Sequence, residues 1–300
     1  SHTTSWAPGT YTMIVEAEDW SGASSSDSIT VSVGKYAQSS VGVSPSSTSV
    51  NVGGSVSFSA SGGSGTGAYS WGGSASGAGS SKSVTFNSAG SQTVTVYRSG
   101  DSSYNDSNTA TATITVNKLS QSAVSISPTS QTVGIGQTVT FSAAGGSGSG
   151  SYTWGGSASG TGSSKSVTFN SAGTYSVTVY RSSDSTYNSS NTATATITVN
   201  QQSQSAVSIS PTSATTTLAG TITFTASGGS GSGAYTWGGS ASGTGSSESV
   251  TFNTVGTQTV TVYRAGNSTY ANSNTATATI TVNKYSQSSV TISPNSSSVT

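Results

Sequence analysis

The acidic side chains that could bind a metal ion are concentrated near the start of the chain. Glu16, Glu18, Asp19 and Asp27 fall within one twelve-residue stretch. On a β-strand, Glu16 and Glu18 would share one face, because successive side chains alternate between the two faces. Calcium takes about six to eight oxygen ligands, usually including several carboxylates. Two interpretations stand: the four residues form a calcium site, or they are a solvated acidic strand edge.

The rest of the chain lacks the parts of a catalytic site. His2 is the single histidine and there is no cysteine, so a nucleophilic triad or a transition-metal site has too few components. The later acids are Asp101, Asp106, Asp184 and Glu248. They do not recur as the fixed pair that glycoside hydrolysis requires. We predict that the protein is not an enzyme and has no cofactor beyond the calcium candidate.

Three tyrosines could contact a ligand on the surface. Tyr180 has the opposite parity to Val177 and Val179, which alternate as buried strand residues do, so its ring should point outward. The same holds for its equivalents, Tyr97 and Tyr263. An outward ring could contact a sugar, a neighbouring filament or a partner. The alternative is a β-bulge that turns each ring inward beside the arginine that follows it.

Glycan attachment is a further hypothesis. Asn105, Asn188, Asn267 and Asn295 open N-x-[ST] triplets, the acceptor sequence for N-glycosylation. Such triplets also arise by chance in a serine-rich chain. The dense outward Ser and Thr would equally suit O-glycosylation, and a glycan coat would explain how a charge-poor surface stays soluble.

The glycine-rich segment 145–150, which recurs through the chain, superficially matches a phosphate-binding loop. No lysine follows it and no helical pattern begins there, so it lacks the helix N-terminus that favours an anion. We interpret it as a flexible loop.

Motifs recur with a period of 83 residues. Trp71, Trp154 and Trp237 keep this spacing without insertion or deletion. The period exceeds the roughly 20–45 residues of a solenoid repeat and suffices for a small autonomous domain. We predict three full repeats at 38–120, 121–203 and 204–286. Residues 1–37 are predicted to end a preceding domain and 287–300 to begin a further repeat, so the chain reads as a slice of a longer polypeptide.

Within a repeat, apolar residues alternate with polar ones, which is typical of strands with one buried face. In the middle repeat, Val139, Phe141 and Ala143 alternate with Thr and Ser. About seven such runs, with Trp154 on a middle strand, predict an antiparallel sandwich. The fold class is therefore all-β, a tandem array of antiparallel immunoglobulin-like β-sandwiches. Because the linkers are short, we expect the repeats to stack lengthwise into an extended rod.

Four motifs of the middle repeat resemble bacterial immunoglobulin-like repeats of surface proteins. They are YTWGG at 152–156, AGTYSVTV at 172–179, DSTYN at 184–188 and TATATITVN at 192–200. Residues 8–33 resemble the end of a PKD-type (polycystic-kidney-disease-type) domain, which is also a β-sandwich. These resemblances imply stalks, adhesins and spacers in cell-surface or secreted proteins.

Composition narrows the function classes. Only 5% of residues are charged and the net charge is zero, whereas about 25% is usual. Such a surface has no electrostatic footprint for nucleic acid or an acidic membrane. We predict a structural extracellular array, a stalk, adhesin shaft or filament subunit, with copies of the same chain or cell-surface glycans as partners. The alternative is a carbohydrate- or cell-binding array, which could be attached to a secreted enzyme.

Overall fold

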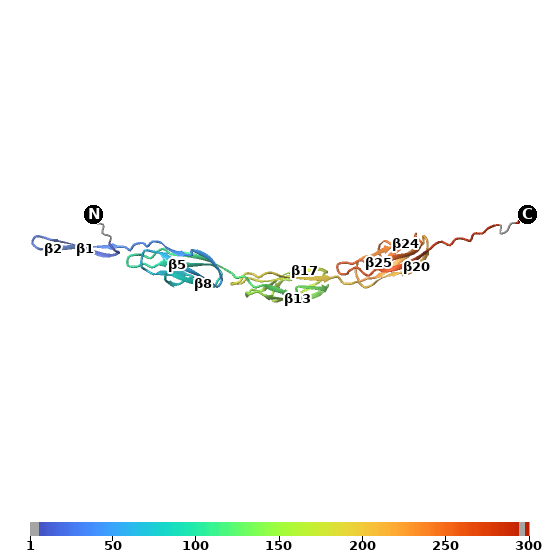
Figure 1. Cartoon of the computed structure of the whole chain (residues 1–300), viewed down its shortest axis with the longest axis horizontal. Coiled ribbons are helices and arrows are strands. Elements are labelled where there is room, and N and C mark those ends of the chain that lie inside the picture. Colours follow the sequence, from blue (N-terminus) through green and yellow to red (C-terminus); the bar gives the residue numbers. More distant parts are fainter. Residues whose placement is uncertain (1–5, 294–297, 300) are drawn as a thin grey trace. The chain divides into compact units, whose positions relative to one another are not determined.

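The computed structural model describes residues 6–293 and 298–299, and its regular elements are all strands. The first two, β1 (Gly9–Glu18) and β2 (Ser24–Val33), form an antiparallel hairpin (Figure 1). One face of this hairpin is apolar and exposed. It includes Met13, Val15 and Ile29, which are 46%, 67% and 60% exposed. The pattern is that of a sheet built to pack against a second layer.

The first repeat has eight strands in two sheets. The three-stranded sheet has the order β3–β5–β8, and the five-stranded sheet has the order β4–β10–β9–β6–β7. All pairings are antiparallel except that of β4 with β10. The strands are β3 (Val41–Ser44), β4 (Ser47–Asn51), β5 (Gly54–Gly62), β6 (Tyr69–Gly73), β7 (Gly77–Ala78), β8 (Ser81–Phe86), β9 (Gly90–Arg98) and β10 (Ala110–Asn117).

The second repeat has the same topology, with sheets β11–β13–β16 and β12–β18–β17–β14–β15. Its strands are β11 (Val124–Ser127), β12 (Ser130–Gly134), β13 (Gln137–Gly145), β14 (Tyr152–Gly156), β15 (Gly160–Thr161), β16 (Ser164–Phe169), β17 (Gly173–Arg181) and β18 (Ala193–Asn200).

The third repeat has sheets β19–β21–β24 and β20–β26–β25–β22–β23. Its strands are β19 (Val207–Ser210), β20 (Ser213–Thr217), β21 (Thr221–Gly228), β22 (Tyr235–Gly239), β23 (Gly243–Thr244), β24 (Ser247–Thr251), β25 (Gly256–Arg264) and β26 (Ala276–Asn283). The predicted fold class, tandem antiparallel immunoglobulin-like β-sandwiches, is confirmed. The expected strand number was one too low, because the two-residue strands β7, β15 and β23 leave no apolar alternation to detect.

The core of the first repeat is formed by the inward residues of both sheets. Phe58 and Trp71, 1% and 6% exposed, have ring centroids 6.4 Å apart. The indole Nε1 of Trp71 donates to Gly79 O at 2.7 Å, so its one polar atom is paired. Burying a side chain of this size stabilises a fold by about 1.5–3 kcal/mol. The other buried members are Val41, Ala60, Ala75, Val84, Phe86, Val94, Val96, Ala112, Ile114 and Val116.

In each repeat, one of the two edge strands of the smaller sheet has a charged residue. Lys82 on β8, Lys165 on β16 and Glu248 on β24 lie opposite the buried residues Phe58, Phe141 and Phe224. They therefore have the parity of the core face. An inward-pointing charge on an edge strand opposes pairing with another chain, because that pairing would desolvate it. We therefore expect these charges to oppose the pairing of β8, β16 and β24 with another chain.

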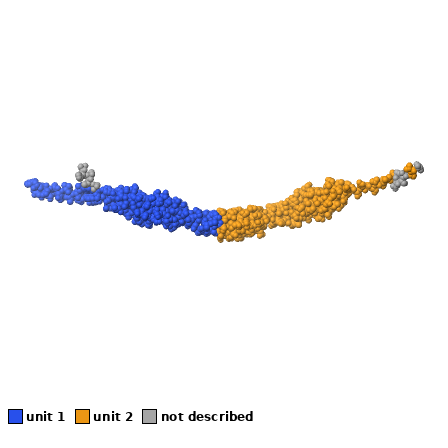
Figure 2. Space-filling model, in the orientation of Figure 1, with its two compact units in different colours: residues 1–124, 145–151, 180–191 blue, residues 125–144, 152–179, 192–300 orange. Residues whose placement is uncertain are grey.

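Contacts between residues divide the chain into two compact units, and the division falls inside the second repeat (Figure 2). One unit contains residues 1–124, 145–151 and 180–191, and the other contains residues 125–144, 152–179 and 192–300. After β26, the described residues of the final segment form no strand, and Val290 and Ile292 are exposed. The predicted domain limits are not tested by this division and stay predictions.

Candidate functional site

The most elaborate polar arrangement in each repeat holds the linker that precedes it. In the first repeat, Tyr36 N donates to Ser103 O and Asn105 N donates to Tyr36 O, both at 2.9 Å. These bonds form an isolated parallel bridge between Tyr36 and Tyr104. Leu119 with Tyr187 and Gln202 with Tyr270 repeat it. We call residues 62–67 and 98–108, with their equivalents in the other repeats, the linker socket.

A glutamine two residues beyond each bridge fills the socket. Gln38 Nε2 donates to the carbonyl oxygens of Asn105, Ser99 and Arg98 at 2.8, 3.2 and 3.3 Å. Its Oε1 accepts from Gly65 N at 3.3 Å. Gln121 and Gln204 make the corresponding bonds. One side chain thus joins the linker to two loops far apart in the sequence.

An arginine at the end of β9 fixes the glycine-rich loop. Arg98 Nε donates to Gly67 O at 2.8 Å, and its Nη1 donates to Gly63 O at 3.0 Å. The guanidinium also lies 5.1 Å from the centre of the Tyr69 ring, within range of a cation–π contact. Arg181 and Arg264 bond the equivalent loops.

The expectation of a flexible loop was therefore wrong. Three of its carbonyl oxygens accept from the Arg98 guanidinium, and the amides of Gly65 and Thr66 donate to side chains of the protein. Glycine is required at Gly67, because a Cβ there would overlap the backbone oxygen of Ser99. A phosphate ion would meet acceptors in this loop, so the structure gives no support to anion binding.

The acidic residue of the socket is structural. Asp101 Oδ2 accepts from Thr66 N at 2.6 Å, and Oδ1 accepts from Ser103 N and Tyr104 N at 2.8 and 2.9 Å. These backbone donors, Thr66 N first, hold the pKa of the Asp101 carboxyl well below its usual range.

Asp184 has the same partners in the second repeat, led by Ser149 N, and the pKa of its carboxyl is lowered in the same way. In the third repeat, Asn267 takes this position. Its Oδ1 accepts from Thr269 N and Tyr270 N at 2.8 Å, and its Nδ2 donates to Ser232 Oγ at 3.0 Å. An amide therefore builds the same turn, so the position does not require a carboxylate.

An asparagine closes the socket against the first strand. Asn108 Oδ1 accepts from Val41 N at 2.7 Å, and Nδ2 donates to Val41 O at 3.1 Å. Asn191 and Asn274 do the same for β11 and β19. Sequence reasoning missed the Gln, Arg and Asn of the socket, although their recurrence every 83 residues was a usable signal.

The three candidate contact tyrosines are half-buried on the outward side of the larger sheet. Tyr97 pairs with Ser70, and Tyr263 pairs with Thr236, in ladders that run without interruption. The neighbouring pair Trp71 and Val96 is buried, so no bulge turns Tyr97 inward. A ligand at Tyr97, Tyr180 or Tyr263 stays a prediction.

The candidate glycosylation residues lie mainly in the sockets. Asn105 and Asn188 are exposed, and their Nδ2 atoms donate to Lys35 O and Lys118 O at 3.3 and 3.4 Å. The Nδ2 of Asn267 is engaged with Ser232, so a glycan there would cost that bond. Asn295 lies outside the described residues. Glycosylation stays a prediction at all four.

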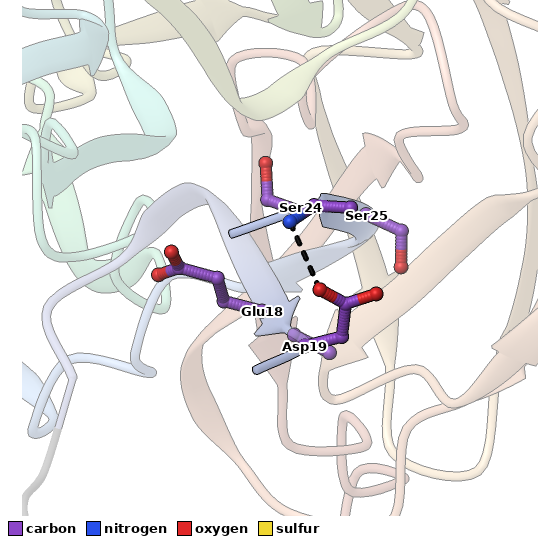
Figure 3. Close-up of a pocket in the computed structure, with 6 residues that line it drawn as sticks. Glu18, Asp19, Ser24 and Ser25 are labelled. Atoms are coloured by element: carbon purple, nitrogen blue, oxygen red, sulfur yellow. Dashed lines mark hydrogen bonds between the residues drawn. The ribbon is translucent and has the colours of Figure 1, made fainter. Parts of the chain in front are cut away.

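The N-terminal acids are not brought together. Asp27 lies opposite Val15, whereas Glu16 lies opposite Ser26 on the other face. Asp19 Oδ1 accepts from Ser21 Oγ, Ser21 N and Ala23 N at 2.6, 2.8 and 3.0 Å, which lowers the pKa of its carboxyl. Glu18 points away from Asp19 beside an open hollow of about 370 Å³ (Figure 3).

Across residues 6–293 and 298–299, no three His, Cys, Asp or Glu side chains are grouped to hold a metal ion. The calcium hypothesis stays a prediction, which calorimetric titration of the protein with calcium tests. The same described residues contain no helix that is long and apolar enough to cross a membrane.

Comparisons with known proteins concern the fold alone. No family model and no curated protein matches the chain. The N-terminal eight Ig domains of Down syndrome cell adhesion molecule (DSCAM) are 12% identical over 92% of this chain and 44% of that chain, with a TM-score of 0.26. This chain thus spans less than half of that structure.

Two further structures are similar at the same level. The fibronectin(III)-like modules of Clostridium thermocellum CbhA are 13% identical over 54% of this chain and 94% of theirs, with a TM-score of 0.27. Mouse cadherin-23 EC22-24 is 15% identical over 82% of this chain and 100% of its own, with a TM-score of 0.28. Because identities and scores are this low, the fold assignment rests on the strand order within each repeat.

Proposed function

We propose that the chain is a structural spacer outside the cell, a stalk, adhesin shaft or filament subunit that holds other parts at a set distance. The observation that carries this proposal is the linker socket. β10 ends at Asn117 and the bridge begins at Leu119, so Lys118 is the single residue between them. Its carbonyl oxygen also accepts from Asn188 Nδ2. A linker bonded along its length resists bending far better than a free one.

Two further features support a structural role. The described residues group no His, Cys, Asp or Glu into a metal site, and their acids with lowered pKa values bond turns instead of facing a reactive group. A surface dominated by Ser, Thr and Gly, without cysteine, suits a secreted or cell-surface chain that does not depend on disulfides. Copies of the same chain and cell-surface glycans are the proposed partners.

The second candidate function is a carbohydrate- or cell-binding array. It is favoured by the outward, half-buried position of Tyr97 and Tyr263, because an aromatic ring with a hydroxyl group can contact both the apolar face and the hydroxyls of a sugar. Changing Tyr97, Tyr180 and Tyr263 together to Ala, and comparing the two proteins on a glycan array, tests this candidate.

Small-angle X-ray scattering tests the spacer. A Gly-Ser-Gly-Ser insertion between Lys118 and Leu119 should shorten the mean end-to-end distance and broaden the distance distribution. The control is the same insertion between Ser88 and Ala89, in the connection between β8 and β9 of the first repeat, where Ser88 is exposed. This insertion should leave the distribution unchanged. If the unaltered chain already scatters like the linker-insertion variant, the linkers are free and the spacer proposal is wrong.

A further inference from the structure

Two repeats carry a polar notch at the same place. In the first repeat, a hollow of about 120 Å³ is lined by Ser74, Thr85, Phe86, Asn87, Ser88 and Gln92. In the third repeat, a hollow of about 180 Å³ is lined by the equivalent Ser240, Thr251, Phe252, Asn253, Thr254 and Gln258. Every lining residue is uncharged. We call each hollow the glutamine notch.

The glutamine that names the notch occupies a core-facing position. Gln92 lies opposite the buried residue Ile114, and Gln258 lies opposite Ile280. Its carboxamide is oriented by a serine, since Ser74 Oγ donates to Gln92 Oε1 at 3.2 Å and Ser240 Oγ donates to Gln258 Oε1 at 3.1 Å. In the third repeat, Gln258 Nε2 also donates to Thr254 O at 3.5 Å. Each notch therefore has an amide held in place by the protein.

The remaining polar groups are available to a ligand. The structure gives the side chains of Asn87 and Asn253 no hydrogen bond within the described residues, and both are exposed. The hydroxyls of Thr85 and Thr251 are oriented by Ser55 and Thr221 at 2.7 and 2.8 Å. Each notch thus offers amide donors, amide acceptors and hydroxyls beside a buried phenylalanine.

The second repeat lacks the glutamine. Tyr175 stands at this position, opposite Ile197. Its ring packs 5.1 Å from the ring of Phe169, and its hydroxyl donates to Ser171 O at 3.0 Å. The Tyr175 ring thus takes the place that the glutamine side chain has in the other repeats, and the chain contains its own version of this position without the amide.

We propose that the glutamine notches of the first and third repeats each bind one neutral sugar residue of a glycan. A charged ligand would find no counter-charge among the lining residues, and a purely apolar one would leave their polar groups unpaired, which is costly. A sugar residue supplies hydroxyls that both donate and accept, matching amides and hydroxyls. The small volume limits the contact to a single ring.

Protein-observed NMR with the isotope-labelled chain tests this proposal. D-galactose, D-glucose, D-mannose and N-acetylglucosamine are titrated separately at millimolar concentrations. We expect at least one of them to shift the side-chain amide signals of Gln92, Gln258, Asn87 and Asn253 in a saturable manner. The backbone amides of Tyr175 and Ser171 should not move.

The chain supplies the matched variants. Gln92→Tyr and Gln258→Tyr copy the second repeat and should weaken binding at the altered repeat by at least about tenfold. Tyr175→Gln opens the second repeat and should give it the same shifts. The proposal is overturned if none of the four sugars shifts these signals, or if the shifts persist unchanged in the Gln→Tyr variants. None of these outcomes bears on linker stiffness, so this proposal and the spacer fail separately.

Discussion

Replacing Phe141 by alanine should strongly destabilise the second repeat and leave the stability of its neighbours unchanged. Phe141 is 0% exposed and its ring lies 6.4 Å from that of Trp154. A Phe→Ala change in a core costs about 3–5 kcal/mol. Domains are stable by about 0.05–0.15 kcal/mol per residue, or roughly 4–12 kcal/mol for a unit of this size. The change should therefore remove between about a quarter and all of the repeat's stability and lower its Tm by about 12–40 °C.

Hydrogen–deuterium exchange with mass spectrometry localises the effect within the full chain. Peptides from β13 and β17 should lose protection, while peptides from β5 and β25 keep it. Ser142→Ala is the control, because Ser142 is exposed on the other face of the same strand and its one hydrogen bond is long, at 3.4 Å. Surface changes of this kind stay within about 0.5 kcal/mol. Simultaneous loss of protection in all three repeats would refute independent folding units.

Three further results are expected. Arg181→Met should lower the stability of the second repeat by about 1.5–3 kcal/mol, because charge-assisted bonds to the glycine-rich loop are lost. Hydrogen–deuterium exchange should become faster at residues 145–150 and their surroundings only. Exchange equal to that of the unaltered chain would contradict this prediction. Because the pKa values of Asp101 and Asp184 are lower in the folded state, the stability they contribute is present above the unfolded value, about 3.9, and is lost as pH falls below it. As pH falls, the first two repeats should therefore unfold before the third, which has Asn267 at this position. Asp184→Asn should make the second repeat as resistant to acid as the third. Thermal scans at several pH values measure this, and equal acid sensitivity of all three repeats would contradict it. Lys165→Val should promote association of chains along β16, which sedimentation velocity detects. A variant that associates no more than the unaltered chain would show that the charge does not guard this edge.

The sequence predicts the sandwich because the determinants of a strand are local. Phe141 and its neighbours alternate with hydroxyl residues, and this alternation alone assigns each to the core or to solvent. The 83-residue recurrence then predicts that each set closes its own core. β15 was not predicted because it has only two residues, which pair through backbone atoms and are too few to show an alternation of apolar and polar side chains.

The linker socket could not be predicted in the same way, since the side-chain bonds of Gln38, Arg98 and Asn105 join residues about 25–70 positions apart and end on backbone atoms. Any residue has a carbonyl oxygen, so nothing in the sequence marks Gly63 or Ser99 as acceptors. The glutamine of the notch was hidden for a related reason. Gln92 occupies a core-facing position on β9. A polar residue at such a position interrupts the apolar–polar alternation, so the sequence alone suggests that the strand begins after it.

Differences in sequence among the three repeats show whether a side chain is needed for its charge or for its hydrogen-bonding geometry. In the socket, the third repeat has Asn267 where the others have aspartate, and the turn keeps the same two backbone donors. Geometry suffices there, and the lowered pKa of Asp184 is a consequence of the turn. On the edge strand, the third repeat has Glu248 where the others have lysine, so the sign of the charge changes and its presence does not.

A group whose role depends on an ion pair could not change sign without its partner, but a group that resists burial works with either sign, since both cost free energy when desolvated. Lys165→Glu should therefore leave the association state of the chain unchanged, and Lys165→Gln, which removes the whole charge, should promote association. Sedimentation velocity of both variants beside Lys165→Val distinguishes these cases. If the glutamate variant associates as the valine variant does, the positive sign itself is required, and the interpretation of Glu248 as an equivalent guard is wrong.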